Sequence, residues 1–195
     1  MDNTPTIETE RLILRRFCRE DIPALFAIYS DRDVNTYLPW FPLTTLAEAE
    51  ELFEREYAKA YEQPRGYRYA VCLKTNNTPV GYVHLGMDGA RDLGYGLSKG
   101  CWHRGITAEA ARAVVEQAGR DRVPYITATH DVNNPRSGHV MRALGMRYRY
   151  TYLEQWQPKD IPVTFRMYQL NLDGDETRVY REYWERHPVH YVEDI

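Results

Sequence analysis

Residues 95–110 decide the fold, and they read Tyr95-Gly96-Leu97-Ser98-Lys99-Gly100-Cys101-Trp102-His103-Arg104-Gly105-Ile106-Thr107-Ala108-Glu109-Ala110. The pattern predicts the end of a strand, a glycine-containing turn and the start of a helix over residues 107–120. A helix start offers backbone N–H groups without partners and the positive end of the helix dipole, which together favour an anion such as a diphosphate. Gly105 would let the backbone approach that anion closely. The same pattern also fits a strand-to-helix turn in which the glycine serves geometry alone.

The segments on either side alternate between strand and helix patterns. Strands are expected at residues 11–17, 67–74, 79–88, 92–97, 123–130, 147–156 and 163–171. Helices are expected at residues 19–30, 44–62, 107–120 and 134–144, with a short one at 176–186. Thr44 or Thr45 can cap the second of these helices. Hairpins combined with a strand–helix–strand unit predict an α+β fold with one mixed, twisted sheet of about six to seven strands, flanked by about four helices. The whole chain, 1–195, is expected to form a single domain.

Composition narrows the class of protein. The 195 residues carry 25 Lys and Arg against 28 Asp and Glu, so there is no basic surplus of the kind that nucleic-acid binders carry. No run of 18 apolar residues is present, and the N-terminal residues lack a signal-peptide pattern, so we expect a cytoplasmic protein without a membrane partner. The three cysteines are widely spaced and predict neither a disulfide framework nor a metal site.

Three motifs in a fixed order support a family resemblance. They are Thr9-Glu10-Arg11-Leu12-Ile13-Leu14-Arg15-Arg16-Phe17, the loop from Trp102 to Ala110, and Asn134-Pro135-Arg136-Ser137 followed by Leu144-Gly145-Met146. Together they resemble the RimJ/RimL-like branch of the GNAT superfamily of acetyltransferases over about residues 7–171. Residues 172–195 form a C-terminal extension outside the resemblance. The loop departs from the family pattern at three positions: Trp102 replaces a polar residue, His103 stands where glycine is common, and Thr107 replaces the last Gly or Ala.

The resemblance implies acetyl-CoA as co-substrate, no metal, and direct attack of an amine on the thioester in a ternary complex. The residues that it assigns to the cofactor are Leu97, Ser98, Trp102, His103, Arg104, Gly105, Ile106, Thr107, Asn134 and Ser137. A backbone N–H near Leu97 or Ser98 would stabilise the oxyanion. Met141 stands where the family usually has a Tyr that acts as the general acid, and Met cannot donate a proton. Ser137 is therefore the candidate acid for the CoA sulfur. Ser137 fits equally well as a first-turn residue of a helix that Asn134 caps.

The general base has three candidates, and a water relay is a fourth possibility. Asp92 opens the strand that leads to the loop, His84 titrates near neutral pH, and Glu154 lies on a long strand. The branch places a catalytic Glu soon after Leu-Gly-Phe, but this chain has Arg147-Tyr148-Arg149 there, which puts a ribosomal-protein substrate in doubt. We interpret Glu109, in the first helical turn, as dipole compensation and packing.

The acceptor is expected to be a primary amine, on a protein N-terminus or on a small molecule. Its site is predicted to use the loop 37–41 together with Tyr148, Tyr150 and Tyr152, which strand alternation would place on one face, lining a cleft or buried against a helix. Either a monomer or a homodimer fits the sequence. The alternative is a catalytically weak CoA-binding sensor or interaction module, which Met141 and the absent downstream Glu slightly favour.

Overall fold

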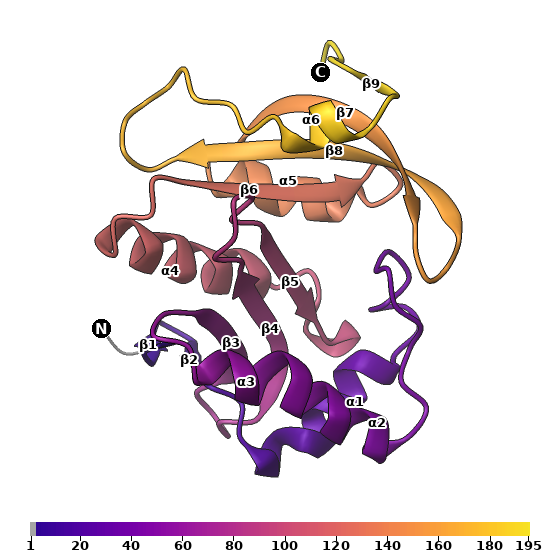
Figure 1. Cartoon of the computed structure of the whole chain (residues 1–195). Helices are drawn as coiled ribbons and strands as arrows, with labels where there is room; N and C mark the ends of the chain where they lie inside the picture. The colour runs from indigo at the N-terminus through magenta and orange to yellow at the C-terminus, as the bar shows by residue number, and fades with distance from the viewer. Residues whose placement is uncertain (1–2) are drawn as a thin grey trace. The chain divides into compact units, whose positions relative to one another are not determined.

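The computed structural model describes residues 3–195, which divide into two compact units (Figure 1). The N-terminal unit consists of the chain up to Leu85 together with Gly94–Val114. The C-terminal unit consists of Gly86–Leu93 and Val115–Ile195. The chain therefore passes between the units three times, the last time within the helix α4 (Ile106–Arg120). No helix within residues 3–195 is both long and apolar enough to cross a membrane.

The N-terminal unit is built on a five-stranded sheet in the order β1-β2-β3-β4-β5. Its strands are β1 (Ile7–Glu8), β2 (Leu12–Arg15), β3 (Tyr67–Leu73), β4 (Pro79–Leu85) and β5 (Leu93–Leu97). The predicted hairpin is confirmed: β3 and β4 pair antiparallel from Tyr67 opposite Leu85. Asn77, in the connecting turn, adopts a φ of 53°, a left-handed conformation that Asn tolerates better than most residues.

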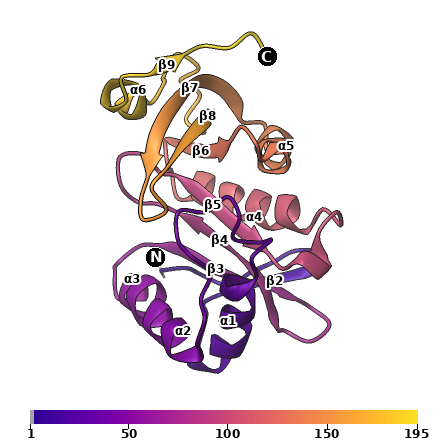
Figure 2. The same cartoon turned by 90° about the vertical axis from the view of Figure 1, so that its right-hand side faces the viewer.

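Helices cover one face of this sheet (Figure 2). They are α1 (Ile22–Ser30) and α2 (Leu46–Leu52), the latter continued by a π-helix (Phe53–Ala58) and by α3 (Lys59–Tyr61). Of the two predicted caps, Thr45 begins α2, because its hydroxyl accepts from the Glu48 N–H. Leu25, Tyr57 and Tyr82 are buried in the resulting core.

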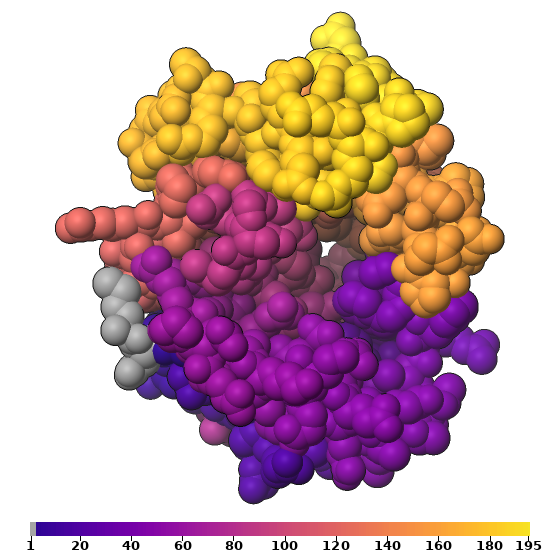
Figure 3. Space-filling model, viewed as in Figure 1, coloured from indigo at the N-terminus to yellow at the C-terminus, as the bar shows by residue number. Residues whose placement is uncertain are grey.

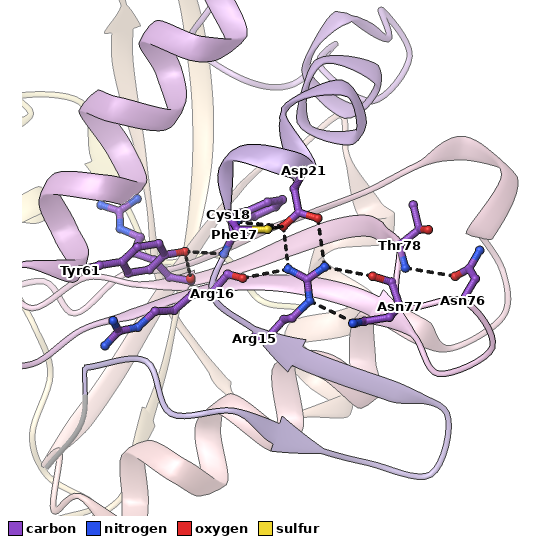
Figure 4. A network of polar contacts seen from close by, with 10 residues as sticks. Arg15, Arg16, Phe17, Cys18, Asp21, Tyr61, Asn76, Asn77 and Thr78 are labelled. Carbon is purple, nitrogen blue, oxygen red and sulfur yellow. Dashed lines mark hydrogen bonds and ion pairs between the residues drawn. The ribbon is translucent and has the colours of Figure 1, made fainter.

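The end of the Thr9–Phe17 motif is fixed by a polar network (Figure 4). Arg15 donates to both carboxylate oxygens of Asp21, at 2.6 and 3.0 Å, and also to the backbone oxygen of Asn77 at 2.9 Å. The backbone N–H of Cys18 donates to Asp21 at 2.9 Å. Because this pairing is bidentate and its carboxylate is buried, it ties the end of β2 to the start of α1 and to the hairpin turn.

The C-terminal unit has a second sheet in the order β6-β8-β7-β9, paired antiparallel throughout. Its strands are β6 (Tyr125–Asp131), β7 (Arg147–Trp156), β8 (Ile161–Asn171) and β9 (His190–Tyr191). Helix α5 (Pro135–Ala143) packs on β6, where Gly138 makes room for the ring of His130. The predicted stop at Gly145 is confirmed, since its φ of +83° is one that glycine adopts without strain.

The α+β class is confirmed, but the strands fall into two sheets where the sequence predicted one. From Leu93 onward β5 belongs to the sheet of β4. Just before it, Asp92 forms an isolated parallel bridge with Thr127 of β6, and within residues 3–195 this bridge does not extend into a strand pairing. All seven predicted strands are present. The two additional strands, β1 and β9, have two residues each, too few for an alternating pattern to reveal.

The tail is part of the C-terminal unit and forms part of its surface in Figure 3, where it is yellow. The predicted helix over residues 176–186 is shorter than expected: α6 covers Glu182–Arg186. The Asp175 carboxylate accepts from the backbone N–H and the hydroxyl of Thr177, and such a side-chain turn competes with helix formation. Arg178 is held by Asp173 at 2.6 Å, which fixes the non-helical conformation further.

Candidate active site

The loop after β5 is fastened to the strand that it leaves. Trp102 donates its indole N–H to the backbone oxygen of Leu97 at 2.7 Å, and a short 3₁₀ turn, Lys99–Cys101, lies between them. Lys99 forms an ion pair with Asp33. Trp102 therefore has a structural function that a short polar side chain at that position could not perform.

The two candidate oxyanion donors, the N–H groups of Leu97 and Ser98, point to opposite sides of the end of β5. The Ser98 N–H donates to the Val80 backbone oxygen at 2.7 Å, so it is used within the sheet. Because N–H directions alternate along a strand, the Leu97 N–H points away from β4, on the side where the Leu97 carbonyl accepts from Trp102. Of the two, Leu97 is the better donor for an external oxygen.

Two residues of the loop adopt left-handed backbone conformations. His103 has a φ of 60° and Gly105 a φ of +72°. Glycine is favoured at such positions, since other residues pay roughly 1–2 kcal/mol for them, which explains why the family pattern commonly has glycine where this chain has His103. A Cβ added to Gly105 would meet nothing closer than the Arg11 guanidinium, at 3.6 Å. The His103, Arg104 and Gly105 residues are all exposed.

Helix α4 begins immediately after this turn and leaves donors for an anion. Its first intrahelical bond runs from the Glu109 N–H to the Gly105 oxygen at 3.0 Å. The N–H groups of Ile106, Thr107 and Ala108 therefore have no acceptor within the helix. Ile106 is buried and anchors the helix, whereas Thr107 is partly exposed. These donors, the open glycine and the exposed Arg104 form a place where an anion such as a diphosphate could bind.

The carboxylate of Glu109 is hydrogen-bonded to residues of the first motif, so its charge is neutralised and does not repel an anion bound at the start of α4. Its carboxylate accepts from the Thr9 hydroxyl at 2.6 Å, from the Arg11 N–H at 3.0 Å and from the Arg11 side chain at 2.6 Å. Burial alone would raise the pKa of Glu109, but these bonds outweigh it and hold the pKa below its usual range. Arg11 also donates to the Arg104 backbone oxygen at 2.8 Å. Arg11 belongs to the first motif, but the sequence carries no signal for this contact with the loop.

Asn134 and Ser137 lie at the start of α5 in the C-terminal unit. Asn134 occupies the N-cap position, where its carbonyl accepts from the Ser137 N–H at 3.2 Å. The predicted cap position is therefore confirmed, although the Asn134 side chain makes no capping hydrogen bond within the described chain. Pro135 at the first helical position lowers the need for one, because it has no N–H to satisfy. Ser137 is partly exposed, and Met141, one turn further on, is buried.

Asp92 has the environment that a base at neutral pH requires. One of its carboxylate oxygens, Oδ1, is buried without a hydrogen-bond partner among residues 3–195. Burial raises the pKa of Asp92 to about 7, and the nearby charge of Asp88 adds to the rise. A carboxylate with such a pKa can accept a proton near pH 7 and release it again.

His84 is enclosed by partners in the N-terminal unit. Its Nδ1 lies 3.1 Å from Arg68 Nη1, and its Nε2 lies 3.0 Å from the Tyr57 hydroxyl. A guanidinium can only donate, so Nδ1 is the acceptor and Nε2 carries the proton in the neutral ring. Burial, and secondarily the charge of Arg68, hold the pKa of His84 well below its usual value. With its lone pair already used by Arg68, His84 is a poorer candidate base than Asp92.

Glu154, the third candidate, lies on β7, and its side chain is 32% exposed. Its oxygen is 3.8 Å from the His187 Nε2 in the tail. In the N-terminal unit, the candidate acceptor loop exposes Tyr37 and Phe41, while Trp40 is fixed by a 2.9 Å hydrogen bond to Asn35.

The three tyrosines of β7 do not share one face, so that prediction is wrong. A bulge lies between Tyr148 and Tyr150: Tyr148 pairs with Tyr168, while Tyr150 pairs with Met167. The extra residue shifts the alternation by one position. Tyr150 and Tyr152 pack in an aromatic cluster with the tail, whereas Tyr148 packs on Tyr168.

Comparisons with known proteins agree on the type of domain. Residues 11–147 match the family model described as "Acetyltransferase (GNAT) domain". An uncharacterized N-acetyltransferase, p20, from Bacillus licheniformis is 26% identical over 57% of this chain, and the match spans 64% of that protein, slightly under two thirds of its length. YoaA, an uncharacterized N-acetyltransferase of Bacillus subtilis, is 22% identical over 85% of this chain and 96% of its own.

Solved structures show the same fold at low identity. A GNAT-family acetyltransferase from Bacillus anthracis superposes with a TM-score of 0.75 at 22% identity, covering 87% of this chain and 99% of that one. A putative ribosomal-protein-serine acetyltransferase from Vibrio cholerae gives 0.73 at 19%, covering 88% and 99%. The microcin C7 self-immunity acetyltransferase MccE, in complex with acetyl-CoA and AMP, gives 0.73 at 14%, covering 84% and 93%. Within residues 3–195, no group of three or more His, Cys, Asp or Glu side chains is arranged to hold a metal ion.

Proposed function

The chain belongs to the GNAT acetyltransferase family, and we propose that it transfers an acetyl group from acetyl-CoA to a primary amine, with Asp92 as the general base. The observation that carries this proposal is the buried, unpartnered oxygen of Asp92, whose carboxyl has a pKa of about 7. A module that merely binds CoA has no need of a proton acceptor tuned to neutral pH. The amine belongs to a protein N-terminus or a small molecule.

The proposed chemistry balances with residues of this chain. When bound, acetyl-CoA supplies a thioester whose acetyl group moves to the amine nitrogen while CoA leaves as its thiol. Asp92 takes one proton from the incoming ammonium, which frees the nitrogen lone pair for the C–N bond. The Leu97 N–H donates to the carbonyl oxygen as charge develops there. Ser137 protonates the departing sulfur and is reprotonated by the second proton that the nitrogen gives up.

CoA binding is assigned to the loop and to the start of α4. The N–H groups of Ile106, Thr107 and Ala108 would hold the diphosphate, with Arg104 beside them, while Asn134 and Ser137 would serve the thiol end. The family match from 11 to 147 extends over parts of both units, and α4 is continuous between them, which supports the proposal that 1–195 is one catalytic domain.

The placement in the RimJ/RimL-like branch is part of the proposal. It is supported by the three motifs in order and by the structural neighbour from Vibrio cholerae that is described as a ribosomal-protein-serine acetyltransferase. Arg147-Tyr148-Arg149 replaces the catalytic Glu of that branch, so the base must come from elsewhere in the chain, and Asp92 fills that requirement.

The pH dependence of turnover tests the assignment. Because Asp92 accepts protons only when ionised, kcat/KM for an amine whose own pKa lies well away from 7 should fall as the pH drops below about 7. Asp92→Asn should lower kcat by about 10²–10⁴-fold. Asp88→Asn removes the charge that raises the pKa of Asp92 but keeps an oxygen for the Arg91 N–H, so it should shift the acidic limb to lower pH.

The assay is thiol release from acetyl-CoA with a panel of primary amines, alongside calorimetric binding of CoA. Binding of CoA with no turnover on any amine would favour the sensor reading, for which the buried Met141 in place of a Tyr is the specific observation. An Asp92→Asn enzyme with unchanged kcat would remove Asp92 from the mechanism while leaving the acetyltransferase function standing.

A further inference from the structure

Strands β4 and β5 are neighbours in the N-terminal sheet (Figure 2), and they approach each other closely where β5 ends. A Cβ added to Gly96 would lie 2.5 Å from Cε1 and 2.8 Å from the hydroxyl oxygen of Tyr82, too close for any real side chain. A Cβ added to Gly81 would lie 3.1 Å from Cα of Leu97. The ring of Tyr82 therefore rests directly on the backbone of Gly96, the residue before the proposed oxyanion donor Leu97.

Two further rings hold the ring of Tyr82 in place. Tyr29 of α1 stacks on it with centroids 5.1 Å apart and planes 17° apart. His84 of β4 stacks on it with centroids 4.7 Å apart and planes 28° apart. Tyr29 and Tyr82 are both buried, and the close packing of a core leaves such rings no space to move.

The hydroxyl of Tyr57 joins these two supporting rings. It lies 3.1 Å from the Tyr29 hydroxyl and 3.0 Å from Nε2 of His84. Because Nδ1 of His84 accepts from Arg68, Nε2 carries the proton and donates to Tyr57, whose own proton can then be donated to Tyr29. A fully buried hydroxyl thus fixes the spacing of the two rings that stack on Tyr82.

This support acts on the peptide that links Gly96 to Leu97. The backbone after Leu97 is fixed by hydrogen bonds, since the Leu97 carbonyl accepts from Trp102 and the Ser98 N–H donates within the sheet. The peptide before Leu97 carries the N–H that points away from β4. Its orientation is set by the contact between Gly96 and the Tyr82 ring. Hydrogen bonds weaken steeply when they bend, so the direction of this N–H decides how well it can bind an oxyanion.

From this arrangement we infer that Tyr82 is a positioning residue for acetyl transfer: its ring fixes the Gly96–Leu97 peptide so that the Leu97 N–H meets the thioester oxygen as charge develops there. An interaction made mainly in the transition state changes kcat and leaves the binding of acetyl-CoA almost unchanged. His84, the poorer candidate base, then serves with Tyr29 to hold that ring. The inference rests on the proposed function and deepens it, since it names what aims the oxyanion donor.

The first test compares substitutions in the full chain, with acetyl-CoA and the primary amine that the wild type acetylates fastest. Tyr82→Leu removes the ring and should lower kcat by about tenfold or more, while KM for acetyl-CoA stays within about threefold. Tyr82→Phe keeps the ring and should stay within about threefold of wild type in both constants. Val83→Ala is the matched control, because Val83 is equally buried on β4 and alternation turns it to the opposite face.

Infrared spectra of bound acetyl-CoA, labelled with ¹³C at the thioester carbonyl, report the hydrogen bond itself. A donor on the oxygen weakens the C=O bond, so the band of the bound cofactor should lie at lower wavenumber than that of free acetyl-CoA. Tyr82→Leu should lose most of this shift, whereas Tyr82→Phe and Val83→Ala should keep it. A merely structural contribution of Tyr82 would lower the melting temperature of Tyr82→Leu and Val83→Ala without separating their bands.

Gly96→Ala perturbs the same contact from β5 and keeps Tyr82 in the core, so it carries the test if Tyr82→Leu does not fold. Its methyl group meets the ring, and the variant should lower kcat by about tenfold or more and reduce the carbonyl shift. In the Tyr82→Leu background the same substitution should cost less than about threefold in kcat, because leucine lacks the Cε1, Cζ and hydroxyl atoms that the methyl would meet.

The contrary outcomes are distinct. An unchanged kcat and an unchanged carbonyl band in Tyr82→Leu or in Gly96→Ala would overturn the positioning by Tyr82 while leaving the acetyltransferase intact. Equal losses in Tyr82→Leu and Val83→Ala, or additive losses in the double variant, would do the same. If wild-type protein binds acetyl-CoA but acetylates no amine, the proposed function fails, and the positioning function fails with it.

Discussion

Glu109→Gln tests whether the first motif holds the cofactor loop in place. The Glu109 side chain is 19% exposed and accepts from Thr9 and from both the backbone and the side chain of Arg11. Glutamine keeps one acceptor oxygen but turns an N–H₂ group toward the guanidinium. Hydrogen bonds to charged groups contribute about 1.5–3 kcal/mol each, but Arg11 is 45% exposed and solvent screens the pair.

We therefore expect a loss of about 1–2 kcal/mol in the free energy of unfolding, measured by urea denaturation at pH 7. A chain of this length would show a drop of roughly 2–8 °C in melting temperature. The matched control is Glu116→Gln on the same helix, whose ion pair with Arg120 is 3.7 Å long and more than half exposed on both sides, so its loss should cost less than about 0.5 kcal/mol.

The difference in stability between wild type and Glu109→Gln should depend on pH in one direction. The folded pKa of Glu109 lies below its ordinary value of 4.5, so its contribution to stability is fully present above pH 4.5 and is lost as the pH falls through the lower folded value. The gap between wild type and Glu109→Gln should therefore close in acid. Equal stability of the two proteins at pH 7, or a gap that widens below pH 4.5, would refute the idea that this carboxylate anchors Thr9–Arg11 to the loop.

Two further substitutions address the cofactor directly. Gly105→Glu should abolish CoA binding in calorimetry, because it places a carboxylate at the assigned diphosphate. The control Gly105→Ala adds about 1–2 kcal/mol of left-handed backbone strain without the charge and should still bind CoA. An unchanged CoA affinity of the Glu variant would show that the diphosphate does not bind at this loop. Ser137→Ala should lower kcat by roughly 10–100-fold while KM for acetyl-CoA stays within about threefold, as expected when a proton donor of the transition state is removed. Equal losses in binding and turnover would identify Ser137 as a binding group alone.

The strand–turn–helix pattern of residues 95–110 could be predicted because each local preference agrees with the fold. Gly105 is open and left-handed, Ile106 is buried, and α4 carries its apolar stripe into the core. The contact between Glu109 and Arg11 could not be predicted, since the two residues are 98 positions apart and no periodicity links them. The two motifs are separate in the sequence, and folding joins them.

The aromatic strand shows where alternation fails. Tyr148, Tyr150 and Tyr152 have the spacing of one strand face, yet the bulge gives Tyr148 a different neighbourhood from the other two. A bulge adds one residue to one strand and depends on its partner, so the sequence of β7 by itself carries no signal for it. The tail was harder still, because a five-residue helix and a two-residue strand are stabilised by packing on β7 and have weak local preferences.

Ranking the candidate bases required the environment of each one. Asp92, His84 and Glu154 are all ionisable residues on or beside strands, and composition gives no reason to prefer any of them. Burial without a partner raises the pKa of Asp92 to about 7, whereas Arg68 occupies the lone pair that His84 would need. The same comparison bears on the two positions where this chain departs from the family pattern of acid and base. A chain with Met141 and without the downstream Glu must find its acid and base elsewhere, and Ser137 and Asp92 both belong to the C-terminal unit.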